Sequence, residues 1–147
     1  MRYYEDLVAG EERVSGSRQV TAAEIIEFAR KYDPQYFHTD EEAAKSSIFG
    51  GLVASGIFTM AVWRQLDHQI AGDIAWICGV AWDDVKFKTA LRAGDEVRAR
   101  AQVSSKRVSN SHPDRGDVIY NYLLLNQHDE TVFSCRSTNL VERKGSR

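Results

Sequence analysis

The sequence has only two cysteines, and it has no group of residues spaced to hold a metal. Cys78 and Cys135 are far apart, so they provide neither a disulfide framework nor the paired ligands of a zinc site. Isolated cysteines behave as small apolar side chains in a reducing compartment, and we expect both to be buried. No metal site is expected.

The sequence also lacks an excess of either charge and lacks a long apolar run. Its 19 basic and 21 acidic residues give a formal net charge of -2, whereas proteins that bind nucleic acid usually carry a clustered basic face. No apolar stretch approaches the ~20 residues of a membrane span. The first 12 residues carry acids where a secretion signal needs an apolar segment. We therefore expect a cytoplasmic protein that contacts neither nucleic acid nor a membrane.

Three enzyme signatures are missing. There is no Gly-x-Ser-x-Gly elbow, no phosphate-binding loop and no dinucleotide fingerprint. The sequence thus gives no support to a serine hydrolase, a kinase or a dehydrogenase, and we expect no cofactor.

What is present is enough for one folded domain over residues 1–147, because 43% of the chain is apolar. Residues 96–103 alternate between apolar and polar, as in a half-buried strand. Further strands are predicted at 13–20, 74–87, 118–125 and 132–141. We expect 1–12 to be an N-terminal tether and 142–147 to be a frayed tail.

The first predicted helix begins at Thr21, whose hydroxyl can cap it, and Glu24 completes a capping box. Pro34 ends this helix, which leaves Asp33 just past its end. A short helix is predicted over 40–46, where acidic residues complement the helix dipole.

A longer helix is predicted over 53–69, and it is apolar nearly all round, as in a buried helix. Only its C-terminal end is polar, and we expect that end to reach water. The predicted architecture is α+β, with a long central helix wrapped by an antiparallel sheet. Edge strands need cover, and a homodimer that pairs sheets edge to edge would provide it.

Asp33 and His38 are the candidate acid–base pair. A carboxylate and an imidazole in one pocket can hold a water between them and transfer protons at neutral pH. The alternative is structural, with Asp33 capping a turn and His38 acting as an ordinary histidine of the surface or core. The other histidines, His68, His112 and His128, lie in polar segments and are expected to be solvated.

Two pairs of small residues follow, Gly50-Gly51 and Ser55-Gly56. Glycine lets the backbone approach a ligand closely, and the start of a helix presents free N–H groups to an oxyanion. The alternative is a helix break followed by tight packing. Lys86, Lys88 and Arg92 could contact a nucleotide phosphate, but an ordinary solvated face is the preferred interpretation of this basic run.

The segments 33–38 and 49–56 together resemble the MaoC-like dehydratases, the (R)-specific enoyl-CoA hydratase branch of the hot-dog fold. The signature of that family is an Asp, four residues and a His, followed by a short helix and a glycine-containing loop into the central helix. Here the two segments read Asp33-Pro34-Gln35-Tyr36-Phe37-His38 and Phe49-Gly50-Gly51-Leu52-Val53-Ala54-Ser55-Gly56. Many members have Asn-Pro where this chain has Gln35-Tyr36, and His where it has Ser55.

The resemblance implies a hot-dog fold and a homodimer or larger assembly with sites at the subunit interface. It implies that Asp33 and His38 bind the catalytic water and that the Gly56 N–H stabilises the thioester oxygen. Ser55, Gln35 and Gly51 are further candidates for substrate binding. The implied reaction is reversible hydration of a 2-enoyl-CoA, with an acyl-CoA or acyl-carrier thioester as substrate. A hot-dog thioesterase and a non-catalytic acyl-CoA-binding subunit are the alternatives.

Overall fold

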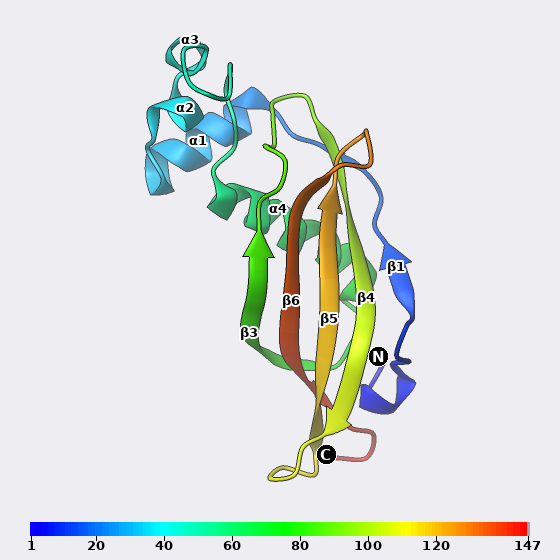
Figure 1. Ribbon diagram of the computed structural model, residues 1–147. Coiled ribbons are helices and arrows are strands. Elements are labelled where there is room, and N and C mark those ends of the chain that lie inside the picture. The colour runs from blue at the N-terminus through cyan, green and yellow to red at the C-terminus, as the bar shows by residue number, and fades with distance from the viewer. Residues whose placement is uncertain (147) are drawn as a thin grey trace.

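The computed structural model describes residues 1–146, and its framework is one antiparallel sheet. The strands lie in the order β1-β4-β5-β6-β3, and the short β2 also pairs with β4 (Figure 1). The strands are β1 (Glu12–Val14), β2 (Arg18–Gln19), β3 (Trp76–Lys86), β4 (Glu96–Val108), β5 (Arg115–Leu125) and β6 (Thr131–Glu142). The predicted antiparallel sheet is confirmed.

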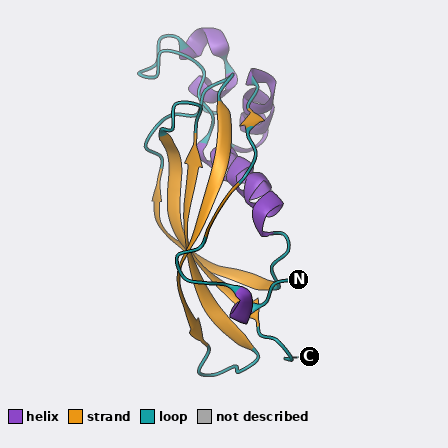
Figure 2. Ribbon diagram, turned by 90° about the vertical axis from the view of Figure 1, so that its right-hand side faces the viewer, coloured by secondary structure: helices purple, strands orange, loops and turns teal. Residues whose placement is uncertain are grey.

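The long helix α4 (Gly56–Ala71) crosses one face of this sheet, and the core lies between them (Figure 2). Trp63 of α4 is completely buried. Its ring centroid lies 4.9 Å from that of Tyr122 on β5 and 4.9 Å from that of Phe133 on β6. Aromatic side chains bury more apolar area than other residues, so Trp63 fixes the helix on the sheet. This arrangement confirms the predicted α+β class.

The helix α1 (Ala22–Tyr32) confirms the capping box. Thr21 Oγ1 accepts from the Glu24 N–H at 3.2 Å, and the Thr21 N–H donates to the Glu24 carboxylate at 3.0 Å. Asp33 is the C-terminal cap, as the following proline predicted. Two single-turn helices follow, α2 (Tyr36–Thr39) and α3 (Glu41–Ala44). All three lie at the end of the sheet beside the start of α4 (Figure 1).

The prediction that α4 begins at Val53 is wrong. Val53 is extended: its N–H donates to Phe37 O at 3.1 Å and it forms a bridge with Arg92. The helix begins at Gly56 because the Ser55 hydroxyl caps it, accepting from the Ile57 N–H at 3.2 Å. Ser55 therefore stands before the first turn rather than inside it.

The faces of α4 also differ from the prediction. Ile57 is 56% exposed, so the helix is not buried all round. Asp67, in the end predicted to reach water, is only 1% exposed and pairs with Arg64 at 2.9 Å. The sheet covers only one side of the helix. Burial of a residue therefore depends on the side of the helix on which it lies, and not on its position along the helix. His68, His112 and His128 are exposed, as predicted.

The first 12 residues are not a loose tether. Tyr4–Asp6 form a turn of 3-10 helix (η1), and Leu7 is completely buried. Tyr4 packs closely on β5, where a Cβ on Gly116 would lie 2.4 Å from its ring. The predicted frayed tail is also held, since Arg143 pairs with Glu5 at 2.9 Å and Lys144 hydrogen-bonds to the same carboxylate through its N–H. Arg147 lies outside the described residues.

Strand lengths differ from the pattern in two places. The predicted strand 13–20 is divided into β1 and β2 around Ser15, whose hydroxyl accepts from the Ala99 N–H at 2.8 Å. β4 and β5 continue further into their hairpin, to the pair Val108–Gly116. A bulge between Val103 and Ser105 shifts the register there and interrupts the alternation that marked the strand.

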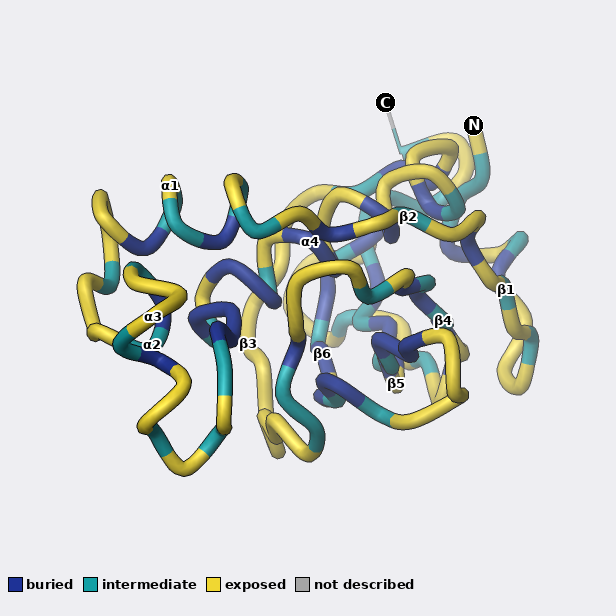
Figure 3. Tube along the Cα trace, turned by 90° about the horizontal axis from the view of Figure 1, so that it is seen from above, coloured by how far each residue is buried: buried dark blue, intermediate teal, exposed yellow. Residues whose placement is uncertain are grey.

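β3 is an edge strand and is exposed over most of its length, as the yellow tube in Figure 3 shows. Cys78 lies on it and is exposed, which contradicts the expectation that both cysteines are buried; Cys135, on β6, is buried. The exposed apolar residues of this segment are Ile77, Val80, Trp82, Val85 and Phe87. No helix among residues 1–146 is long and apolar enough to cross a membrane.

Candidate functional site

A cavity of about 650 Å³ lies at the N-terminal end of α4. One wall is formed by α2 and the segment before α4, and another by the connection from β3 to β4. Most of its lining is apolar: Phe37, Phe49, Val53, Ala54, Ile57, Met60, Phe87, Ala90, Leu91 and Val132. Its ionisable lining residues are Asp33, His38 and Lys88. The cavity therefore joins an apolar chamber to an acid–base pair.

Asp33 and His38 meet in this cavity, as the sequence predicted. Asp33 Oδ2 lies 3.7 Å from His38 Nε2, which is beyond hydrogen-bond distance. The other ring nitrogen, Nδ1, lies 2.6 Å from the backbone carbonyl of Val53. His38 is buried and lies on α2, which begins three residues after Asp33.

The contact with Val53 O determines the tautomer of a neutral His38. A carbonyl oxygen only accepts hydrogen bonds, so Nδ1 carries the proton. Nε2 is then an acceptor and faces the carboxylate of Asp33, which is also an acceptor. Two acceptors cannot bond to each other, but both can accept from one donor placed between them.

Ser55 lies beside Asp33 and is completely buried. Its hydroxyl donates to Asp33 Oδ2 at 2.7 Å and accepts from the Ile57 N–H at 3.2 Å. Ser55 is absent from the lining of the cavity. It therefore holds Asp33 against the helix terminus, whereas the sequence had suggested that it contacts substrate.

Gly56 lines the cavity as the first residue of α4. Its N–H has no hydrogen-bond partner within residues 1–146, as expected at a helix N-terminus. A Cβ at this position would lie 3.0 Å from the Phe87 ring. Glycine thus lets Phe87 pack directly over the start of the helix.

Gln35 and Gly51 are not brought into the cavity. Gln35 precedes α2 and is exposed, and its backbone carbonyl accepts from the Thr39 hydroxyl. Gly51 lies in the loop before α4, with Arg92 beside it. The adjoining Gly50 has φ +68°, a left-handed conformation that explains a glycine there without any ligand.

The sequence did not identify most of the chamber. Its walls come from four separate segments, and apolar residues in them resemble any other core residue. Lys88 was considered as a contact for a nucleotide phosphate, but the sequence favoured a solvated face and did not place it beside Asp33 and His38. Within residues 1–146, no group of three or more His, Cys, Asp or Glu side chains is placed to hold a metal ion.

Comparisons with known proteins identify the family to which this chain is similar. A sequence profile described as the MaoC like domain matches residues 7–120. The Bacillus subtilis (strain 168) protein YdeM is 32% identical over 132 residues, which cover 86% of this chain and 89% of that protein.

Two solved structures extend the comparison. The MaoC-like dehydratase of Rhodospirillum rubrum has a TM-score of 0.92 and 36% identity, covering 98% of this chain and 99% of that one. The R-hydratase PhaJ1 of Pseudomonas aeruginosa has a TM-score of 0.77 and 17% identity, covering 97% and 86%. At that identity the second similarity concerns the fold. The chain therefore belongs to the MaoC-like dehydratase family and has the hot-dog fold.

Proposed function

We propose that this protein is a hydro-lyase that adds water to a 2-enoyl thioester or removes it from a 3-hydroxyacyl thioester. The main support is the pair of acceptors, His38 Nε2 and Asp33 Oδ2, which face each other at 3.7 Å. A water that donates one hydrogen bond to each would present an oxygen lone pair to the cavity. That water is the nucleophile of the proposed reaction.

In hydration, the water oxygen bonds to the β-carbon while Asp33 or His38 takes one of its protons. The electrons of the double bond move toward the thioester carbonyl, which gains enolate character. The captured proton then passes to the α-carbon, from its acceptor or from the neighbouring member of the pair. Dehydration reverses these steps. Atoms and electrons balance without an oxidant or reductant, so the reaction requires no cofactor.

The N-terminus of α4 is suited to the developing negative charge. Gly56 lines the cavity, its N–H has no protein partner within residues 1–146, and the dipole of a 16-residue helix adds positive potential at this end. We assign this N–H to the thioester oxygen. The apolar chamber of about 650 Å³ would hold the acyl chain.

A homodimer is the proposed assembly. β3 presents unpaired backbone groups at the sheet edge, and it carries four exposed apolar side chains, with a fifth on Phe87 directly after it. An exposed apolar edge is a template for another strand, and a second copy could pair with it antiparallel. Phe87 belongs both to this segment and to the cavity, so pairing would bring the partner close to the site.

Two assays on the same enoyl-CoA esters distinguish the reaction classes. Loss of enoyl absorbance reports hydration, and release of free thiol reports a thioesterase. Asp33→Asn and His38→Gln should each lower the hydration rate by a factor of about 10²–10⁴, as expected for removal of an acid–base group. His128→Gln, in the exposed loop between β5 and β6, is the control for loss of an imidazole.

Wild-type hydration rates in folded Asp33→Asn or His38→Gln protein would exclude the proposed mechanism. Thiol release without loss of absorbance would instead identify a thioesterase. Tight binding of enoyl-CoA without either signal would identify a non-catalytic binding subunit. Circular dichroism of each variant confirms that the fold is intact.

A further inference from the structure

The basic side chains near the cavity differ from those elsewhere on the sheet. From Arg98 to Lys144, every arginine and lysine has an ion-pair partner except Lys106, which donates to a backbone carbonyl. In contrast, Lys86, Lys88 and Arg92 form no ion pair within the described chain. These three cations therefore lie within seven residues of one another, with Lys86 at the end of β3 and Lys88 and Arg92 on the connection to β4.

The neighbouring carboxylates do not neutralise them, because each has another partner. Asp83 and Asp84 face Arg136 of β6, at 3.9 Å and 3.4 Å. Asp95 accepts from the Arg92 backbone N–H and from the Gln127 amide, both at 2.9 Å. The charges of Lys86 and Lys88 thus remain available to a ligand.

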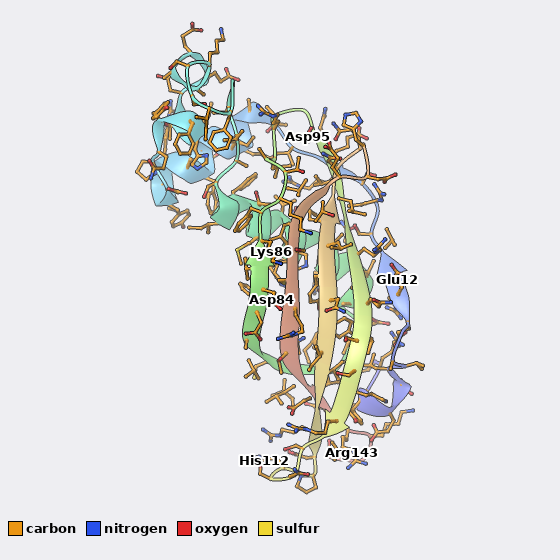
Figure 4. The ribbon with its side chains drawn as sticks, in the orientation of Figure 1. Glu12, Asp84, Lys86, Asp95, His112 and Arg143 are labelled. Atoms are coloured by element: carbon orange, nitrogen blue, oxygen red, sulfur yellow. The ribbon has the colours of Figure 1, made fainter. Side chains whose placement is uncertain are left out.

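Two of these cations border the cavity. Lys88 lines it directly. Arg92 donates from Nη2 to the carbonyl of Phe49, another lining residue, at 2.7 Å, which leaves its remaining guanidinium donors free. Figure 4 places Lys86 at the end of β3 beside α4, and Arg143 at the opposite end of the sheet. The positive charge is therefore local to the end that holds the cavity.

We infer that Lys88, with Arg92 and Lys86 beside it, binds a phosphate group of the carrier to which the acyl chain is attached. This assignment rests on the proposed function and extends it to carrier recognition. The thioester must lie near Gly56 and the acyl chain in the apolar chamber, so the carrier arm leaves across the cavity rim. Both coenzyme A and the phosphopantetheine arm of a carrier protein present phosphate there, and ammonium and guanidinium groups bind phosphate strongly.

The test compares crotonyl-CoA, crotonyl-phosphopantetheine and crotonyl-pantetheine, which share the acyl arm and differ in phosphate. For wild-type protein, kcat/KM should be highest for crotonyl-CoA, lower for crotonyl-phosphopantetheine and lowest for crotonyl-pantetheine. In Lys88→Gln, the preference for crotonyl-CoA over crotonyl-pantetheine should fall about tenfold, through KM, as expected for loss of a charge-assisted hydrogen bond. Its salt dependence should weaken as well. Lys144→Gln, at the far end of the sheet, removes the same charge and should keep the wild-type preference.

The phosphopantetheine ester identifies the phosphate. If Lys88→Gln affects it as much as crotonyl-CoA, the phosphate on the pantetheine arm is bound; if only crotonyl-CoA responds, a nucleotide phosphate is bound. Both results support the inference. An unchanged preference in Lys88→Gln, or the same loss in Lys144→Gln, would overturn it.

Calorimetry with butyryl-CoA and butyryl-pantetheine separates this inference from the reaction itself. If no ester turns over but Lys88→Gln selectively weakens butyryl-CoA binding, the phosphate site stands and the proposed reaction fails. Equal weakening of both ligands would reject the phosphate site whether or not turnover occurs.

Discussion

The Ser55 hydroxyl donates to Asp33 Oδ2 at 2.7 Å, joining residues that are 22 positions apart in the chain. The same hydroxyl caps α4 through the Ile57 N–H. One side chain thus fixes both a candidate acid–base group and the helix terminus that faces the cavity. Displacement of either would disturb the other.

Substitution of Ser55 should therefore affect both stability and activity. Ser55→Ala removes a helix cap, at a cost of about 1 kcal/mol in unfolding free energy. It also frees the Asp33 carboxylate, and we expect kcat to fall about tenfold because positioning is lost. Urea unfolding and the hydration assay measure the two effects. Thr21→Ala, at the cap of α1, should reduce stability similarly and leave kcat unchanged. Equal losses of kcat in both variants would mean that destabilisation alone explains the effect.

The contact between Gly56 and Phe87 leads to a second prediction. In Gly56→Ala the new Cβ would lie 3.0 Å from the Phe87 ring, so the ring or the helix start must shift. We expect kcat/KM to fall about tenfold while stability changes little, since alanine is acceptable at the first position of a helix.

A double-mutant cycle tests this cause. Adding Phe87→Ala removes the ring that the methyl group meets, so Gly56→Ala should cost less in that background than alone. Strictly additive losses would indicate that the methyl group acts on the substrate directly.

The exposed edge of the sheet should respond to charge. Val80→Lys places an ammonium group on β3 at a position that is 59% exposed, and it should convert a dimer to a monomer. Light scattering after size exclusion measures the mass. Val14→Lys makes the same change on β1, at the opposite edge and 50% exposed, and should leave the dimer intact. A monomeric wild type, or a dimer that persists in Val80→Lys, would contradict pairing through β3.

Asp67 leads to a prediction about pH. Burial raises the pKa of its carboxyl above the ordinary 3.8, and the Arg64 guanidinium and His68 oppose this shift. The folded state therefore holds the proton more tightly than the unfolded state. The stabilising contribution of Asp67 is complete below pH 3.8 and is lost as pH rises through the raised pKa.

An asparagine side chain does not titrate, so the Asp67→Asn variant should not lose stability in this way as the pH rises. The unfolding free energy of the wild type, relative to Asp67→Asn, should decrease between pH 3.8 and neutral pH. Urea unfolding of both proteins over that range measures the difference. A difference that stays constant or increases with pH would show that the ion pair with Arg64 outweighs burial.

Local sequence patterns correctly predicted the start and the end of α1, because both depend on residues that are close together in the chain. Thr21 and Glu24 are three residues apart, so their mutual hydrogen bonds follow from helix geometry alone. Pro34 restricts its immediate neighbour, and Asp33 accordingly ends α1. The α+β class also followed from such patterns, whereas the spacing of Asp33 and His38 left a structural alternative open and the family resemblance favoured a shared site.

Features that depend on distant contacts could not be predicted in this way. Asp67 looked like a solvated residue, yet it is buried and interacts with Tyr122 of β5, which is far away in the sequence. Ser55 was predicted to lie inside the helix, because the local pattern does not show its hydrogen bond to Asp33, which lies 22 positions earlier. Cys78 is exposed because β3 is an edge strand, and strand order is not encoded in the apolar pattern of one strand.

The bond from His38 to Val53 O has a consequence for protein engineering. Its acceptor belongs to the main chain, so no side-chain replacement at Val53 can delete it while the backbone keeps its course. The proposed acid–base pair is thus separable from the chamber walls, such as Phe49, Met60 and Val132. A library that varies those walls could be selected for new acyl groups while the imidazole keeps its tautomer.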